Sequence, residues 1–213
     1  MDGTTAWTTE PPIFGGLLYV IECISGGQKK GEGPLGELFD MICDDDKFGE
    51  DSWKKSESEL QKEALALALG NAGISKEEVR YLYAGDLLGQ NIATSFGLMD
   101  YKIPLFGLYG ACSTAGEALS LAAMAVSAGY GDYIAAVTSS HFASAEKQFR
   151  FLLEYASQRP LSSTWTVTGS GAFILGKKRV ISKSLESLQD ELRIMELQIL
   201  LIWEQPWHRR QQM

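Results

Sequence analysis

The sequence has few histidines, few cysteines and no long apolar run, and each shortage argues against a class of protein. Two histidines in 213 residues argue against a histidine-rich metal site. The three cysteines, at positions 23, 43 and 112, form no CxxC pair, which indicates a reducing compartment without a disulfide framework. No apolar run reaches the ~20 residues of a membrane-spanning helix. The N-terminus also lacks the basic start and apolar stretch of a signal peptide.

Basic residues are outnumbered by acidic ones, and the formal net charge is −8. Nucleic-acid and polyanion surfaces need clustered lysine and arginine, so we expect no nucleic-acid partner. We expect neither a metal nor an organic cofactor. With 45% hydrophobic residues, the chain can bury one sizeable core.

Apolar segments of two kinds alternate along the middle of the chain and predict an α/β fold whose sheet is at least partly parallel. Strands are expected at residues 17–24, 79–84, 105–109, 133–138 and 172–175, and helices at 58–72 and 113–128. The second helix is apolar nearly all round, which predicts that it is buried.

The segment LFGLYGACSTAG, residues 105–116, predicts a strand, a tight turn and a helix, with Cys112 at the start of the helix. Unpaired N–H groups and the helix dipole at that position favour a thiolate. A buried cysteine acting as a small hydrophobe is the structural alternative. A thiol nucleophile also needs a base, and His141 is the plausible histidine. A lone histidine after a strand is also typical of a structural residue whose ring nitrogens are hydrogen-bonded.

The turn around Cys112 resembles the nucleophile elbow of thiolases and of beta-ketoacyl-carrier-protein synthase III. Further strings make the chain resemble the stage V sporulation protein AD family more closely: GEGPLGELFD (31–40), AGDLLGQN (84–91), LYGACSTAGEALSLAAM (108–124), SSHFASAEKQFRF (139–151), EYASQRP (154–160) and TWTVTGSGAFILG (164–176). The resemblance implies a thiolase-like fold, of which residues 1–181 form the N-terminal half of a duplicated, five-layered architecture. Residues 15–27 do not resemble the early strand of the family.

The resemblance also implies a function. Members are expected to bind dipicolinic acid (pyridine-2,6-dicarboxylate) and to support its uptake into the developing spore. The intact protein is expected to form a homodimer and to work with other proteins of the same sporulation operon. It is expected in the cytoplasm or forespore, peripheral at the spore inner membrane through those partners. The histidine and asparagine that assist the cysteine in condensing enzymes lie in the second half, so a non-catalytic protein is expected. The alternative is an acyltransferase that uses a cysteine nucleophile.

Site residues follow from the same resemblance. Cys112 takes the position of the superfamily's nucleophile, which is expected to be vestigial. The other positions carried over are the loop residues Asp86 and Gln90, the pocket-border residues His141, Glu146, Gln148 and Arg150, and the turn residues Thr168, Gly169 and Gly171. A dianionic ligand would also need an arginine such as Arg150 or Arg159. No metal ligands are expected.

Each of these positions also has a structural alternative. Asp86 is expected to serve as a helix N-cap. Glu146 and Arg150 have the spacing of an i,i+4 pair on a solvated helix. The glycines are expected in a turn that requires a positive φ.

Residues 182–213 do not resemble the family and are predicted to arise from a reading-frame error, which would make this chain a truncated form. With one permitted codon choice, a frame that begins one base earlier turns IWEQPWHRRQQM into NMGAAMAPAAAD, preceded by DYGIADLT. That string resembles the segment that follows the first half in the family. The alternative is an amphipathic helix, because Leu185, Leu188, Leu192 and Met195 have helical spacing. A truncated product without a function of its own is a further possibility.

Overall fold

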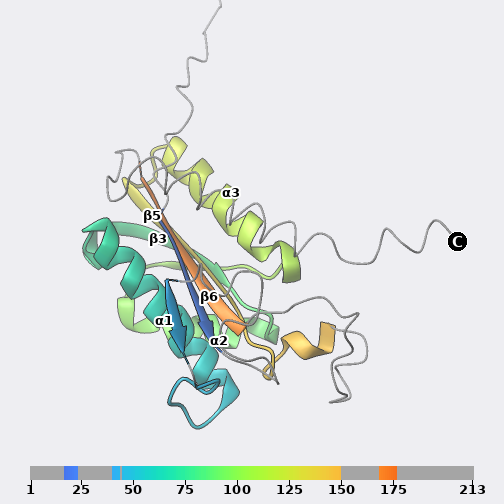
Figure 1. Cartoon of the computed structure of the whole chain (residues 1–213). Helices are drawn as coiled ribbons and strands as arrows, with labels where there is room; N and C mark the ends of the chain where they lie inside the picture. Colours follow the sequence, from blue (N-terminus) through green and yellow to red (C-terminus); the bar gives the residue numbers. More distant parts are fainter. Residues whose placement is uncertain (1–16, 24–39, 44, 150–167, 177–213) are drawn as a thin grey trace, which may run out of the picture.

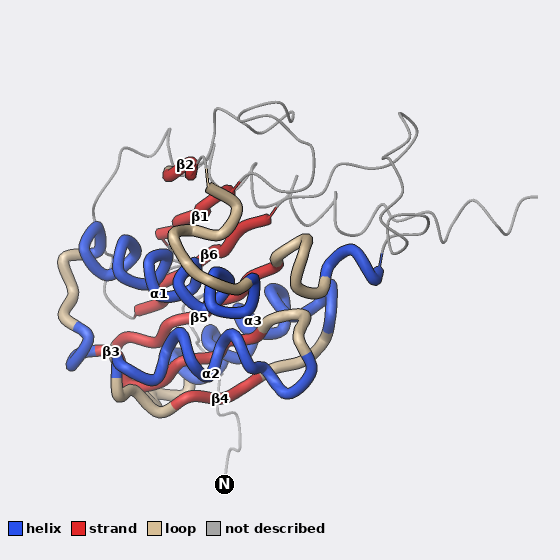
Figure 2. Tube along the Cα trace, turned by 90° about the horizontal axis from the view of Figure 1, so that it is seen from below, coloured by secondary structure: helices blue, strands red, loops and turns tan. Residues whose placement is uncertain are grey.

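The computed structural model describes residues 17–23, 40–43, 45–149 and 168–176. Its centre is a six-stranded mixed sheet in the order β2-β1-β6-β5-β3-β4 (Figure 2). The strands are β1 (Leu17–Cys23), β2 (Met41–Cys43), β3 (Val79–Gly85), β4 (Leu105–Gly107), β5 (Tyr133–Ser140) and β6 (Thr168–Gly176). Parallel pairing joins β1 to β2 and β3 to both β4 and β5. Strand β6 lies between β5 and β1 and is antiparallel to both.

Three α-helices accompany the sheet: α1 (Trp53–Ala72), α2 (Ile92–Leu98) and α3 (Thr114–Ser127). Helices α1 and α3 cover opposite faces of the sheet (Figure 1). Short 3-10 turns lie between them, at η1 (Lys76–Glu78), η2 (Gly89–Asn91), η3 (Met99–Tyr101), η4 (Ala111–Ser113) and η5 (Glu146–Phe149). No helix of the described ranges is both long and apolar enough to cross a membrane.

The predicted strands are confirmed with small changes at their ends, and β2 and α2 were not predicted. Helix α1 begins five residues before the predicted start at residue 58. Its N-cap is Ser52, whose extended backbone precedes the helix and whose hydroxyl accepts a hydrogen bond from Lys55 N at 3.4 Å. This earlier start places Glu57 inside the helix.

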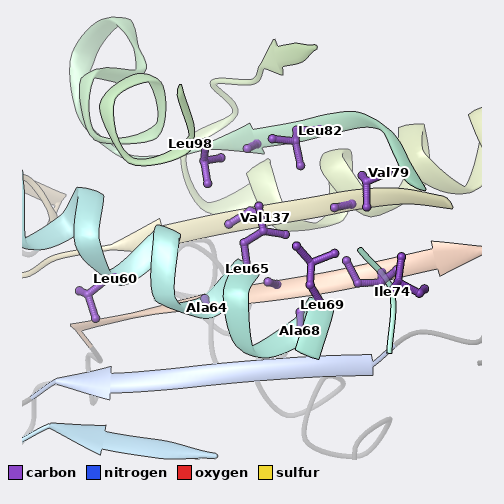
Figure 3. Packing of buried hydrophobic residues seen from close by; sticks show 14 residues of the cluster. Leu60, Ala64, Leu65, Ala68, Leu69, Ile74, Val79, Leu82, Leu98 and Val137 are labelled. Atoms are coloured by element: carbon purple, nitrogen blue, oxygen red, sulfur yellow. The ribbon is translucent and has the colours of Figure 1, made fainter. Parts of the chain in front are cut away.

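The main hydrophobic core lies between α1 and the sheet (Figure 3). Helix α1 contributes side chains at helical spacing to this core: Leu60, Ala64, Leu65, Ala68 and Leu69. The sheet contributes Leu82 and Val137, which have no exposed surface. Because residues of opposite parity along the strands face α3, the two helices pack on separate sets of side chains.

The second core lies under α3 and consists largely of alanine, with Ala118, Ala122 and Ala125 from the helix. The sequence predicted that α3 is buried, and for its sheet-facing side this is correct. Its outer side is not covered by any part of the chain that the structure describes, and Met124 is 65% exposed. The apolar character of α3 therefore does not translate into burial on all sides.

Candidate functional site

Three strands end at the same edge of the sheet, because β3, β4 and β5 run parallel. Strand β3 leads into Asp86, β4 leads into the turn that carries Cys112, and β5 leads into His141. Crevices outside the carboxyl ends of parallel strands are the usual binding sites of open α/β sheets. This carboxyl edge is therefore the candidate site, and the structure brings three predicted residues to it.

Cys112 lies in the 3-10 turn η4 and is exposed, directly before helix α3. The prediction of a cysteine at a helix start is confirmed, and the alternative of a buried small hydrophobe is wrong. The turn is fixed by its own hydrogen bonds: Gly110 N donates to Thr114 Oγ1 at 3.0 Å, and Ser113 Oγ donates to Gly110 O at 2.7 Å. Ala111 has φ +50°, which costs a non-glycine residue free energy and marks a constrained turn.

The turn presses closely against the end of β3 at Gly85. A Cβ on Gly85 would lie 2.2 Å from Leu108 O and 2.6 Å from Thr114 Cγ2. Leu108 N also donates to Ala84 O at 2.8 Å. Glycine is therefore required at position 85, since it lets the chain that carries Cys112 approach the strand.

His141 is buried, and both of its ring nitrogens have backbone partners. Nε2 lies 2.8 Å from Asp46 O, and Nδ1 accepts a hydrogen bond from Ala143 N at 3.1 Å. Nε2 therefore carries the proton of a neutral ring. Burial lowers the pKa of His141, and the hydrogen bond to Asp46 O opposes this only in part. The structural alternative for His141 is confirmed: the ring has no free nitrogen to act as a base or to meet an anion.

Asp86 is buried and its carboxylate is fully occupied. Oδ1 accepts from Leu88 N at 2.7 Å, while Oδ2 accepts from Thr94 N at 2.8 Å and from Thr94 Oγ1 at 2.6 Å. It thus acts on the first turn of α2 as an N-cap would, although Asn91 holds the N-cap position itself. Gln90 is exposed on the same loop and has φ +66°.

Sequence reasoning missed a buried carboxyl beneath this edge. Glu57 of α1 has no exposed surface and accepts hydrogen bonds from Ser139 Oγ at 2.9 Å and from Ser144 Oγ at 2.6 Å. Burial raises the pKa of Glu57 to about 7, and the two serine hydroxyls oppose the rise. The Ser52 N-cap signal could have extended α1 to include Glu57, but it could not have shown the serine partners.

Gln61, one turn further along α1, joins three elements of the edge. Its Nε2 lies 3.2 Å from Gly85 O, 3.0 Å from Thr94 Oγ1 and 2.8 Å from Ser139 Oγ. These contacts connect α1 to the end of β3, to α2 and to the end of β5. Together, Glu57 and Gln61 fix the ends of the strands from which the candidate site is built.

The other residues predicted from the family resemblance lie in β6, in η5 or outside the described residues. Gly169 and Gly171 lie inside β6, where they pair with Ser140 and Thr138, so the prediction of a glycine turn there is wrong. Thr168 begins the strand and accepts a hydrogen bond from Phe142 N at 3.0 Å. Glu146 is buried in η5, which contradicts a pair on a solvated helix. Gln148 is exposed, and Arg150 and Arg159 lie outside the described residues.

No group of three or more histidine, cysteine, aspartate or glutamate side chains that could hold a metal ion occurs within the described ranges. Arg80 is the one arginine within the described ranges, and it lies near the start of β3, at the far end from the candidate site. An arginine contact to a ligand at this edge would therefore come from outside the described ranges, whereas Lys147 of η5 and Lys47, whose Nζ lies over the Trp53 ring, are described cations near it.

A mixed α/β sheet with helices on both faces and an exposed cysteine at the start of a helix is the arrangement that the resemblance to thiolase-like proteins led us to expect. Known proteins support a more specific assignment. The model of the family Stage V sporulation protein AD matches residues 15–187. The Stage V sporulation protein AD of Bacillus subtilis (strain 168) is 38% identical over 177 residues, which is 83% of this chain and 51% of that protein. The chain belongs to the stage V sporulation protein AD family.

Solved structures with a similar arrangement include two condensing enzymes. The priming beta-ketosynthase of the R1128 polyketide biosynthetic pathway has a TM-score of 0.46 at 18% identity, over 58% of this chain and 36% of that one. The 3-oxoacyl-[acyl-carrier-protein] synthase III of Aquifex aeolicus VF5 has a TM-score of 0.43 at 20% identity, over 55% and 37%. The chain spans about half of the length of its curated relative and less of these enzymes.

The family match also bears on the ends of the sequence. It begins at residue 15, so the expectation that residues 15–27 depart from the family is wrong. It ends at residue 187, so residues 182–187, which were predicted to depart from the family, lie within the match. Residues 182–213 lie outside the described residues, and their origin in a shifted reading frame stays a prediction.

Proposed function

We propose that this chain is a truncated form of a sporulation protein that binds dipicolinic acid and supports its uptake into the developing spore. Membership of the stage V sporulation protein AD family supports the role in sporulation. Binding rather than catalysis is supported by one observation at the candidate site. The ring of His141 has both nitrogens engaged by backbone groups, so it cannot activate the exposed thiol of Cys112.

The chemistry of dipicolinate suggests which ligand contacts this chain supplies and which ones the rest of the protein supplies. The ligand is a planar dianion and requires N–H donors together with at least one cation. In the turn at Cys112 the N–H groups of Gly110, Ser113 and Thr114 already have acceptors, so backbone donors would have to come from the neighbouring Ala111 and Cys112. We expect Arg150, Arg159 or the second half to supply the cation, because a guanidinium binds a carboxylate through two hydrogen bonds. We therefore expect this chain alone to bind dipicolinate weakly or not at all.

Equilibrium dialysis with radiolabelled dipicolinate tests this proposal, with the 213-residue chain and the Bacillus subtilis relative measured side by side. The relative should retain the ligand, and this chain should not. Benzene-1,3-dicarboxylate is the matched control, because it carries the same two carboxylates without the ring nitrogen. Micromolar binding by the chain alone would place the pocket within residues 1–180. Absence of binding by the relative would overturn the proposed ligand.

The second candidate function is acyl transfer through Cys112, and the exposed thiol in a constrained turn at a helix start favours it. We expect no turnover of acetyl-CoA or of malonyl-carrier-protein, because residues that assist a nucleophile act with it as a unit. Turnover that disappears in Cys112→Ala would establish the enzyme instead. Iodoacetamide labelling of Cys112 as a function of pH provides a second readout.

Partners and location remain part of the proposal. The intact protein would be a homodimer that acts with other proteins of its operon, peripheral at the spore inner membrane. Release from membranes by a high-salt or alkaline carbonate wash is the expected result, and retention after both washes would contradict it. The sequence of the locus beyond codon 181, read in the shifted frame, should encode a second α/β half with its histidine and asparagine.

A further inference from the structure

The carboxyl group of Glu57 bridges helix α1 to the segment that follows β5. Its Oε1 accepts a hydrogen bond from Ser139 Oγ, near the end of β5, and its Oε2 accepts one from Ser144 Oγ, within that segment. Beyond Ser144 the chain turns on itself: Ala145 N and Glu146 N donate to His141 O, and Gln148 N donates to Ala145 O. These local hydrogen bonds hold the turn together but do not attach it to α1.

The neutral acid fits this site without an unpaired atom. Ser144 Oγ lies 3.1 Å from His141 O as well as 2.6 Å from Glu57 Oε2. When Glu57 is protonated, its O–H can donate to Ser144 Oγ, whose hydrogen then turns to His141 O. Ser139 Oγ continues to donate to Oε1. Every donor in the chain from Glu57 to His141 O then has an acceptor.

The ionised acid meets a less favourable environment. From the loop after β3, the carboxylate of Asp86 acts on Glu57 with like charge. From the segment after β5, the backbone N–H of His141 donates to the Glu57 carboxyl and lowers its pKa in part, while the His141 ring is buried and neutral and Glu146 is also buried. From the loop before α1, Asp46 contributes its carbonyl oxygen to Ser56 Oγ and to the His141 ring. No basic side chain is among the described groups that act on Glu57, so a buried anion lacks a counter-charge.

We propose that Glu57 is a proton-controlled latch, which holds the turn at residues 141–149 closed on helix α1 while the carboxyl is neutral and loosens it when the carboxyl ionises. Ionisation favours movement of the turn because that movement admits water to the anion. Because burial places the pKa of Glu57 at about 7, the latch changes state near neutral pH. The latch does not depend on which ligand the edge binds, so it stands apart from the function proposed above.

Hydrogen exchange followed by mass spectrometry tests the latch on the full chain at about pH 6 and about pH 8, with rates corrected for intrinsic base catalysis. Protection of the amides of Ala145, Glu146 and Gln148 should fall roughly tenfold at the higher pH, while the amides of β3 and β5 keep theirs. In Glu57→Gln the protection should be equal at both pH values, because the amide mimics the neutral acid. Glu59→Gln is the matched control on the same helix, since Glu59 forms a surface pair with Lys62 at 3.1 Å; it should behave as the wild type.

Two results would overturn the proposal: a pH response of Glu57→Gln equal to that of the wild type, or a loss of protection shared equally by β3 and β5. If Glu57→Gln does not fold, Ser144→Ala replaces it. Removing this hydroxyl should leave the turn poorly protected at both pH values. If amide protection in Ser144→Ala fell between the two pH values as much as in the wild type, the latch would also be rejected.

Discussion

The two faces of the sheet are covered by helices of opposite character. Helix α3 is the more apolar helix, yet it packs mainly alanines on the sheet, and its outer side is uncovered within the described ranges. Helix α1 has a mixed sequence, yet it buries Leu60, Leu65, Glu57 and Gln61 completely. An apolar sequence therefore shows that a helix can tolerate burial on all sides. Whether a side is buried depends on which elements pack against it. The uncovered apolar side of α3 is a surface that a packing partner would protect from water.

The largest expected difference between the faces comes from truncating a core leucine on the α1 side. Leu65 has no exposed surface and lies in the main core, so Leu65→Ala should lower the free energy of unfolding by about 3 to 4 kcal/mol. Met124→Ala, on the outer side of α3, should change it by less than about 0.5 kcal/mol. Urea denaturation followed by circular dichroism measures both. Equal losses would mean that Met124 is covered in solution, for instance by a second copy of the chain.

Glu57, the buried acid on the α1 face, should make the free energy of unfolding depend on pH. The pKa of Glu57 is raised from 4.5 to about 7 in the folded chain, so the folded state binds the proton more tightly than the unfolded state. Its contribution is fully present below about pH 4.5 and is lost as the pH rises through 7. The full loss is roughly 3 kcal/mol, since one pKa unit corresponds to about 1.4 kcal/mol.

Denaturation midpoints at a series of pH values test this dependence. In Glu57→Gln, the fall in stability between mildly acidic and mildly alkaline pH should shrink by most of that amount. Glu59→Gln should keep the wild-type profile, because its carboxylate lies in a surface pair. A profile of Glu57→Gln that still falls through neutral pH would assign the titration to another group.

Glycines on the two sides of the sheet should respond in opposite directions. Gly85→Ala forces a Cβ against Leu108 O and Thr114 Cγ2 at the turn before α3, and should cost about 2 to 3 kcal/mol. Gly70→Ala, within α1, has no atom within 4 Å of its Cβ and should stabilise by roughly 0.5 to 1 kcal/mol. Thermal unfolding distinguishes the two variants. If Gly85→Ala were neutral, the turn at Cys112 would not be held against β3 as the structure places it.

Local patterns in the sequence were sufficient for some features and not for others. The turn at Cys112 was predicted because a strand, small residues and a helix follow one another within twelve residues. The Glu57 site was not, because its partners Ser139 and Ser144 lie 82 and 87 residues away. The glycines of β6 were placed in a turn because glycine is permissive, and only the insertion of β6 between β5 and β1 shows that they are extended. Pairing across the sheet is the information that local pattern lacks.

The smallest expected effect concerns how the two helices begin. Helix α1 has a side-chain cap, since Ser52 Oγ accepts from Lys55 N, whereas no side-chain cap bond forms at the start of α3. At 3.4 Å this bond is long and exposed, so Ser52→Ala should cost about 0.5 to 1 kcal/mol, the lower part of the range for N-caps. Ser58→Ala is the matched control within the same helix. Its hydroxyl donates to Lys54 O at 3.1 Å, a contact that competes with helix geometry, so its loss should be neutral or slightly stabilising. Chemical denaturation of both variants measures the difference. If Ser52→Ala matched Ser58→Ala, the Ser52 hydroxyl would not cap helix α1 in solution, and the first turn that leads to Glu57 would be held by packing against the sheet alone.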